Sequence, residues 1–105
     1  MTIKAATLAI NWFAKRTTQR FALGHIVATP GALELAEKGV NLFGFLQQHA
    51  TGQWGDIDPK DQEANEYAVY HSLRIWSVYE TPHGRRSIIT EADRTATTFL
   101  LADEY

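Results

Sequence analysis

The chain has 105 residues, of which 45% are hydrophobic and 21% are charged, a composition typical of one small globular domain. Ten Lys and Arg residues against twelve Asp and Glu residues give a formal charge of −2, so the chain has no overall basic field that would attract nucleic acid. The lack of cysteine excludes disulfides, thiolate metal sites and cysteine nucleophiles, and it fits a cytoplasmic protein.

Residues 1–20 are predicted to form a helix or arm ahead of a single α+β domain that spans residues 21–105. This stretch contains one apolar run, AATLAINWFA, which Asn11 interrupts and which is too short to span a bilayer. No convincing signal-peptide cleavage site follows the run. We therefore expect no membrane partner.

The first half of the domain is predicted to form one strand and then three helices. FALGHIVA, residues 21–28, is short, apolar and partly β-branched, which indicates a strand. Helices are expected over residues 30–38, over residues 42–49 and from Pro59 onward, since each follows a capping residue. The three caps are Thr29, Asn41 and Asp58. The third helix also shows a pattern at helical spacing that predicts a buried stripe, made of Ala64, Tyr67, Ala68 and His71.

The rest of the chain is predicted to form three strands joined by two turns. LRIWSVYE, RRSIITE and TATTFLLA are rich in β-branched and aromatic residues, and TPHG is typical of a turn. The corner before the last strand contains no glycine, so the register of that strand stays open by one residue. We expect an α+β fold with a small antiparallel sheet, a three-stranded C-terminal meander plus an N-terminal strand, packed against two to four helices.

Charge complementarity predicts the pairing of the first two of these strands. If TPHG is a four-residue loop, oppositely charged residues meet at both ends of the ladder, which favours that register. The predicted pairs are Glu80 with Arg85, Val78 with Ser87, Trp76 with Ile89 and Arg74 with Glu91. Ile75, Tyr79 and Ile88 then share the opposite face, which we expect to be core.

Four stretches of the sequence carry a family resemblance: FALGHIVATPGAL, HATGQWGD, DPKDQEANEYAV and SIITEADRTATTFLLADEY. Together they resemble small plasmid-related hypothetical proteins, encoded on plasmids and integrative elements of proteobacteria and often labelled as type I restriction endonuclease subunit M. The resemblance covers residues 21–105 and implies a mobile-element setting, with no catalytic residue to carry over. The restriction label does not fit, because the glycine-rich cofactor loop and the Asn/Asp-Pro-Pro loop of an adenine methyltransferase are both missing.

The chain contains some of the residues that three kinds of site would need: a metal site, a nuclease site and a serine-nucleophile site. A divalent cation could be held by a set whose spacing matches no metal motif: His49, Asp56, Asp58 and His71. A small nuclease could use basic groups to stabilise a phosphorane and a histidine to shuttle a proton. The candidate nuclease residues are Arg74, Tyr79, His83, Arg85, Arg86, Arg94 and Tyr105. The serines Ser72, Ser77 and Ser87 lack the G-x-S-x-G pattern of a nucleophile elbow.

The sequence also allows two non-catalytic functions, the binding of nucleic acid and the binding of a protein. Nucleic acid could meet the basic stretch KRTTQR or the pair Arg85–Arg86, with a tryptophan stacking on bases. A protein partner or a second copy could meet the large aromatic residues, which are many for a chain of this size. These are Trp12, Phe13, Trp54, Trp76 and Tyr105.

The sequence thus favours an uncharacterised mobile-element accessory protein that acts by binding, without a metal or cofactor. The mobile-element setting implies a link to defence, counter-defence or element maintenance. A small nuclease or related hydrolase is the alternative. The candidate binding residues are Arg94, Arg86, Trp54, Trp76 and Asp93. Among them Asp93 is expected to shape a turn, and Arg94 has no structural role that the sequence reveals.

Overall fold

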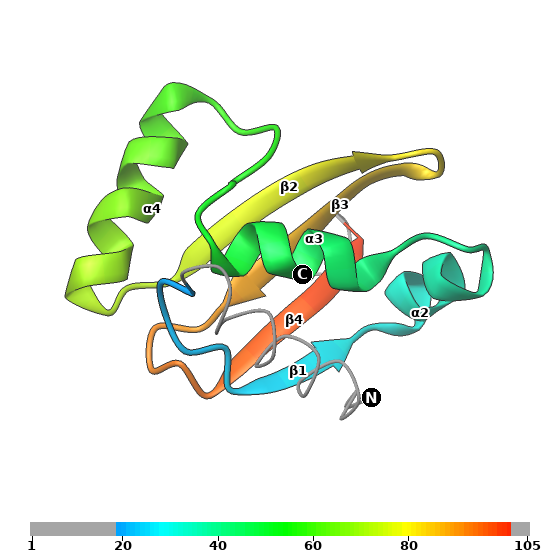
Figure 1. Ribbon diagram of the computed structural model, residues 1–105, viewed down its shortest axis with the longest axis horizontal. Helices are drawn as coiled ribbons and strands as arrows, with labels where there is room; N and C mark the ends of the chain where they lie inside the picture. The colour runs from blue at the N-terminus through cyan, green and yellow to red at the C-terminus, as the bar shows by residue number, and fades with distance from the viewer. Residues whose placement is uncertain (1–18, 102–105) are drawn as a thin grey trace.

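The structure of the chain is a computed structural model that describes residues 19–101, so the predicted N-terminal helix or arm lies almost entirely outside the described residues. Three helices and four strands make up an α+β fold, as predicted (Figure 1). In chain order these are β1 (His25–Ala28), α2 (Pro30–Glu37), α3 (Leu42–Ala50), α4 (Pro59–His71), β2 (Ile75–Thr81), β3 (Gly84–Thr90) and β4 (Ala96–Leu101). Within residues 19–101 no helix has the length and apolar character needed to cross a membrane.

The four strands form one mixed sheet in the order β1-β4-β3-β2. The C-terminal meander β2-β3-β4 is antiparallel throughout, as predicted. The position of the first strand, which the sequence left open, is beside β4, and the two strands run parallel. The chain therefore passes through all three helices before it returns to the sheet, and the β1–β4 pair joins the two halves of the domain.

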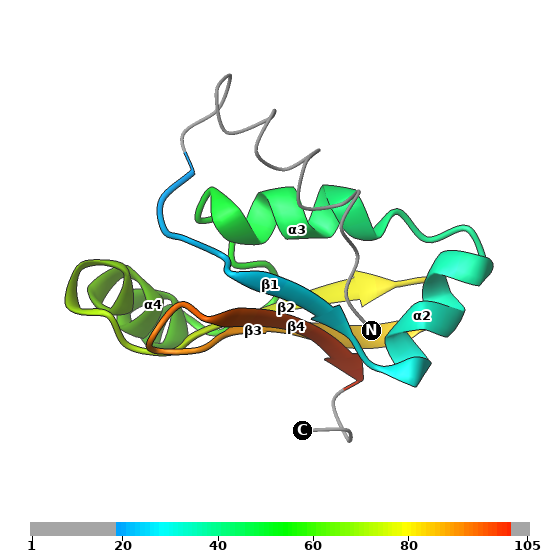
Figure 2. The ribbon, with the colours of Figure 1, turned by 90° about the horizontal axis from the view of Figure 1, so that it is seen from below.

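One face of the sheet carries the main core and lies under α3 (Figure 2). Ile75, Tyr79 and Ile88 are buried on this face, which confirms the predicted core positions. Ile26 of β1 and Phe99 of β4 extend the same layer. Helix α4 lies beside the outer edge of β2, and α2 lies at the opposite end of the sheet (Figure 1).

The three predicted caps begin the three helices. Thr29 Oγ1 accepts a hydrogen bond from the backbone N–H of Ala32 at 3.3 Å. Asn41 Oδ1 and Asp58 Oδ1 accept equivalent bonds three residues along the chain, at 3.1 Å and 2.9 Å. Each cap satisfies one of the N–H groups that a helix start leaves without a partner, so local sequence defines where these helices begin.

The first strand is shorter than predicted, because it begins at His25 and not at Phe21. Phe21 and Leu23 are buried in the core, but the chain around them is irregular. Gly24 causes the break, since its φ of +65° is left-handed and its Cα lies so close to the Thr95 backbone that a Cβ would collide. An apolar run therefore predicted burial correctly and strand geometry wrongly.

The predicted buried stripe of α4 is also wrong. Of its four residues, only Ala68 is buried, whereas Ala64, Tyr67 and His71 are exposed. Asn65 faces inward instead, with its amide accepting from the Trp76 N–H at 3.1 Å and donating to the Trp76 carbonyl at 2.7 Å. The side-chain amide thus takes the place of a neighbouring strand, and this pairing fixes the rotation of the helix.

The hairpin register predicted from charge is confirmed by the pairs Glu80–Arg85, Val78–Ser87 and Trp76–Ile89. Thr81 pairs with Gly84, so the loop between the strands is only Pro82–His83. The ladder ends at Ile75–Thr90, one pair short of the expected Arg74–Glu91. The last strand is in the register that places Thr97 and Phe99 on the core face.

The outer edge of β2 is covered by the loop that contains Trp54, Gly55 and Asp56. The Val78 N–H donates to the Trp54 carbonyl at 3.2 Å, and the Asp56 N–H donates to the Val78 carbonyl at 2.7 Å. Gly55 has a φ of +79° and lies against Val78 so closely that no Cβ would fit. With Asn65 nearby, the loop occupies backbone groups that an edge strand would otherwise offer to another chain.

This close approach predicts that Gly55→Ala destabilises the fold by roughly 2–4 kcal/mol, since the new methyl group collides with the Val78 carbonyl and the left-handed backbone is strained. Gly39→Ala is the matched control. Gly39 is also left-handed, with φ +88°, but apart from its chain neighbours no atom lies within 4 Å of the position that a Cβ would take, so a cost of about 1 kcal/mol is expected. Equal losses in urea unfolding would contradict a steric role for Gly55.

Candidate functional site

Arg94, the residue without an evident role in the sequence, clamps the end of α4. Its Nη2 donates to the Ala68 carbonyl at 2.9 Å, and its Nη1 donates to the carbonyls of Leu73 and Glu91 at 2.7 Å and 3.1 Å. The guanidinium also lies 5.6 Å from the centre of the Phe21 ring. A cation at the carbonyl end of a helix is favourable, so Arg94 joins α4 to the β3–β4 turn.

Arg86 and Arg85 brace the β2–β3 hairpin. Arg86 donates to the carbonyls of Arg85 and His83 at 2.8 Å and 2.7 Å, and its Nε is buried without a hydrogen-bond partner among residues 19–101. Arg85 makes ion pairs with Asp56 at 3.1 Å and with Glu80 at 3.3 Å. Both guanidinium groups are therefore held by neighbouring parts of the same chain.

Trp54 is buried, with an exposed fraction of 5%, and fills the space between α3, α4 and the start of the domain. Its indole N–H donates to Glu66 at 3.0 Å, and Arg20 holds the same carboxylate through two bonds of 2.8 Å. The bond from Arg20 lowers the pKa of Glu66. The Phe21 ring stacks on the indole at 6.1 Å. Trp54 is thus a core residue rather than a contact residue.

Asp93 shapes the turn between β3 and β4, as expected. Its Oδ1 accepts from the Thr95 hydroxyl at 2.6 Å and from the Thr95 N–H at 3.1 Å. These bonds stabilise the ionised carboxylate and lower the pKa of Asp93. The side chains of Asp93 and Arg94 serve separate contacts, although the two residues are adjacent.

Trp76 remains as the candidate with an available surface. It lies on the sheet face opposite α3, and 38% of it is exposed. Its indole N–H donates to Ser87 Oγ at 3.2 Å, which holds the ring across the neighbouring strand. Its predicted partner Ile89 is buried. The ring therefore has a fixed orientation and an open side.

The groups proposed for a nuclease do not converge. His83 and Arg86 lie at the beginning of β3, while Arg94 follows its end. Nor do the suggested metal ligands meet, since Asp58 caps α4 and His49 is fully buried. In the described part of the chain no group of three His, Asp or Glu side chains is placed to hold a metal ion.

A buried polar chain through the core is the main feature that sequence reasoning missed. His49 of α3 contacts Ser77 Oγ of β2 through Nδ1 at 2.6 Å and Thr90 Oγ1 of β3 through Nε2 at 2.8 Å. The Thr90 and Thr97 hydroxyls are 2.7 Å apart, and Thr97 donates to the Leu23 carbonyl at 2.7 Å. The signal was present in the strands, where Ser77, Thr90 and Thr97 each lie two residues from a core residue and therefore share the face of the sheet that carries the core.

The pair of His49 and Ser77 has a spacing that would suit nucleophilic catalysis, but both side chains are fully buried. Burial lowers the pKa of His49 to about 3, and the positive charge of Arg94 acts in the same direction. The imidazole is therefore neutral at pH 7. Because a substrate cannot reach Ser77 without opening the core, the arrangement serves structure.

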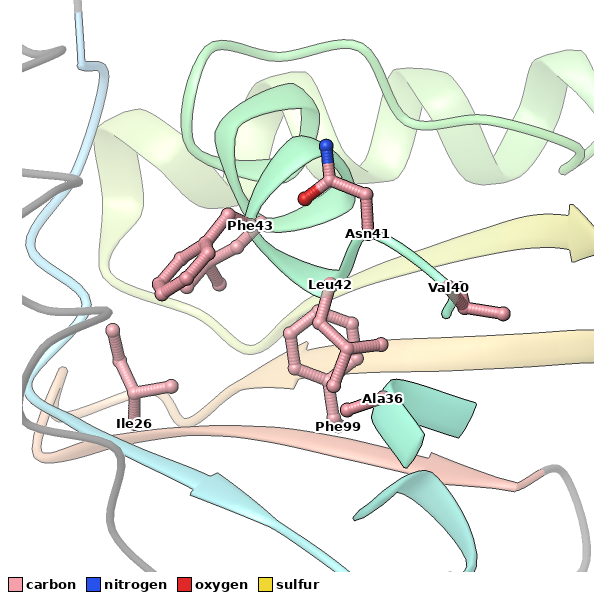
Figure 3. A pocket seen from close by; sticks show the side chains of 8 residues that line it. Ile26, Ala36, Val40, Asn41, Leu42, Phe43 and Phe99 are labelled. Carbon is pink, nitrogen blue, oxygen red and sulfur yellow. The ribbon is translucent and has the colours of Figure 1, made fainter. Parts of the chain in front are cut away.

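Two hollows lie on either side of Val40 and Asn41, which connect α2 to α3. The first has a volume of about 190 Å³ and is almost wholly apolar (Figure 3). Figure 3 shows the Asn41 amide turned away from Leu42 and Phe99, which both line this hollow. The second hollow, about 340 Å³, lies toward the tip of the β2–β3 hairpin and includes charged and amide groups.

Exposed large hydrophobic residues are frequent in the second half of α4 and at the start of β2, at the opposite end of the domain. Five such residues are exposed in the described chain, and four of them fall between residues 67 and 76. These four, Tyr67, Tyr70, Leu73 and Trp76, are called the α4-end surface below. The Tyr67 ring stacks on His71 at 3.8 Å, and the Arg20 guanidinium lies 6.0 Å from the Tyr70 ring. Each of these two rings thus has one neighbouring side chain against it.

The lowered pKa of His49 predicts a loss of stability in acid. The folded pKa of about 3 lies below the unfolded value of 6.5, so the stability that neutral His49 contributes is fully present above about pH 6.5 and is lost as the pH drops toward 3. At pH 4.5 the loss is roughly 2–3 kcal/mol. Urea unfolding at several pH values measures it. NMR of the imidazole tests the cause, and protonation of His49 above pH 5 in the folded state would contradict it.

The Arg94 clamp predicts a graded loss of stability. Arg94→Ala removes the bond to the Ala68 carbonyl of α4 and the bond to the Leu73 carbonyl just after the helix, and it should cost roughly 2–4 kcal/mol. Arg94→Lys keeps the charge but lacks the fork that reaches several carbonyls, so a smaller loss is expected. Lys60→Ala, an exposed change in the first turn of α4, is the control and should stay within about 0.5 kcal/mol. Similar urea midpoints for Arg94→Ala and the control would contradict the clamp.

No protein-family model, curated protein or solved structure matches this chain. The resemblance to mobile-element proteins stays a prediction. What the surfaces of the domain can bind therefore has to follow from their own residues.

Proposed function

We propose that this chain is a non-enzymatic binding protein and that the α4-end surface contacts a protein partner. The observation that carries this proposal is the concentration of exposed tyrosine, leucine and tryptophan side chains in residues 67–76. Tyrosine and tryptophan are the residue types that contribute most to protein interfaces, since each combines a large apolar area with a polar group.

The geometry of these side chains supports a role in binding. Tyr67 is stacked on His71, and the Trp76 indole is hydrogen-bonded to Ser87. A side chain that is already ordered loses less conformational entropy when a partner covers it. The exposed fractions of Tyr67 and Tyr70, 58% and 77%, leave most of both rings for such a partner.

The contacts that the arginines make within the chain support a binding function and disfavour a hydrolytic one. Arg86 and Arg94 hold carbonyls of their own chain, while Arg20 and Arg85 are paired with carboxylates. Using any of them to stabilise a phosphorane would require giving up these contacts. The same contacts make these four arginines less available for phosphate groups, which disfavours nucleic acid as the main partner.

A different protein fits the surface better than a second copy paired through the sheet. Asn65 and the loop at Gly55 occupy backbone groups along the outer edge of β2, which disfavours strand pairing at that edge. If the mobile-element resemblance is correct, the partner belongs to defence, counter-defence or element maintenance. Recognition would then be by apolar burial around Trp76 and the two tyrosines.

The test is affinity purification of the full chain from its native host, followed by reconstitution with the purified partner. We expect a stoichiometric complex that Tyr70→Ala and Trp76→Ala each weaken at least tenfold, about 1.4 kcal/mol or more. Phe43→Ala is the matched control, because Phe43 has the same exposed fraction as Trp76, 38%, but lies on α3. It should bind as the wild type does.

Two results would contradict the proposal as a whole, and a third would change the identity of the partner. One is a complex that Tyr70→Ala and Phe43→Ala affect equally, because binding would then not depend on this surface. The other is cleavage of RNA or DNA by the purified chain that His83→Ala abolishes, which would favour the nuclease alternative. A homodimer that Trp76→Ala dissociates would replace the foreign partner with a second copy.

A further inference from the structure

We propose that the hollow at the hairpin tip binds a small organic anion that carries an aromatic ring. This hollow, called the tip pocket below, lies between the α2–α3 connection, the first turns of α3 and the β2–β3 loop. Its lining residues are Lys38, Gly39, Val40, Asn41, Gly44, Phe45, Gln48, Pro82 and His83. Its volume of about 340 Å³ falls at the small end of the range for ligand pockets, roughly 300–1,000 Å³.

The charge of the tip pocket is positive. Lys38 contributes an ammonium group from one side and His83 a ring from the other, and none of the lining residues is acidic. The Arg86 guanidinium is fixed behind this wall by its bond to the His83 carbonyl at 2.7 Å. No carboxylate within residues 19–101 forms an ion pair with Arg86. An anion is the ligand complementary to this combination.

The walls of the tip pocket also contain apolar side chains and an amide group that could contact a ligand. Phe45 is held in place by stacking on Tyr79, with the ring centres 5.0 Å apart and the planes at 22°. Val40 and Pro82 line the same space, so a flat ring can lie against apolar carbon. The Gln48 amide can donate to an oxygen of the ligand. In a ligand that consists of a ring with one anionic substituent, the ring would contact the apolar side chains and the anionic group would contact the basic and amide groups.

The pocket is organised before a ligand arrives. Thr81 Oγ1 donates to the Gly84 carbonyl at 2.8 Å and accepts from the His83 N–H at 3.0 Å. Together with the Arg86 bond, these contacts fix the two-residue loop that carries His83. On the other wall Asn41 caps α3 through the Gly44 N–H at 3.1 Å. Fixed walls reduce the entropy lost on binding, which favours a small ligand.

This site is independent of the proposed protein partner. The tip pocket lies at the hairpin end of the sheet, while the α4-end surface lies at the other end, beside the start of β2 (Figure 1). The residues that line the tip pocket include no member of the α4-end surface. Failure of one proposal therefore leaves the other standing.

The experiment is an NMR titration of the full ¹⁵N-labelled chain with four probes: phenyl phosphate, benzoate, inorganic phosphate and benzyl alcohol. We expect saturable shifts of the Gly39, Gly44 and His83 amides with phenyl phosphate or benzoate. Inorganic phosphate should bind more weakly, because it lacks the ring, and the uncharged benzyl alcohol should bind more weakly than either aromatic anion. The aromatic anion that binds more tightly identifies whether the anionic group is a phosphate or a carboxylate.

Three variants distinguish binding in the tip pocket from nonspecific attraction of an anion to a surface lysine. Lys38→Gln and His83→Gln should each weaken the tighter aromatic anion about fivefold, through loss of a charge-assisted contact. Lys60→Gln is the matched control, since Lys60 is an exposed lysine on α4, and it should have no effect. The proposal is overturned if no probe saturates, if benzyl alcohol binds as tightly as benzoate, or if Lys38→Gln and Lys60→Gln behave alike.

Discussion

The position of α3 on the sheet depends on the hydrogen bonds of one buried imidazole. His49 reaches Ser77 on β2 and Thr90 on β3, and Thr97 carries the chain of contacts on to β4 and the Leu23 carbonyl. Each polar group in this chain would cost about 1–3 kcal/mol if it were left without a partner. A slide or rotation of α3 would break the chain of contacts, so this network fixes the helix more sharply than apolar packing alone can.

The placement of α3 decides which surfaces remain open. With His49 turned toward the sheet, Leu46 and Ala50 pack in the core, while Phe43 and Gly44 at the start of the helix border the two hollows beside the α2–α3 connection. Four arginines also make contacts within the chain and are therefore less available to a ligand. Arg20 and Arg85 pair with carboxylates, and Arg86 and Arg94 donate to backbone carbonyls. Away from these contacts, aromatic side chains are exposed at one end of the domain, and the apolar hollow and the tip pocket lie at the other end.

Several predictions from the sequence depend on short-range physics, and those are confirmed. The starts of the helices follow from caps three residues from their bonding partners, and the β2–β3 register follows from charges that meet across one hairpin. The predictions that failed needed contacts from distant parts of the chain. Nothing near Asn65 in the sequence shows that Trp76 needs an amide partner, and nothing near Gly24 shows that the β3–β4 turn lies against it.

By itself, then, the sequence determined the α+β class, the order of the elements, the hairpin register and the turn role of Asp93. Only the tertiary structure decided that β1 pairs with β4, that Arg94 clamps α4, and that Trp54 is buried while Trp76 is open. The physical reason is that caps, turns and cross-strand charges act over a few residues. Whether a side chain meets another segment or solvent depends on contacts between residues 11 to 74 positions apart, as the Asn65–Trp76 and Leu23–Thr97 bonds illustrate.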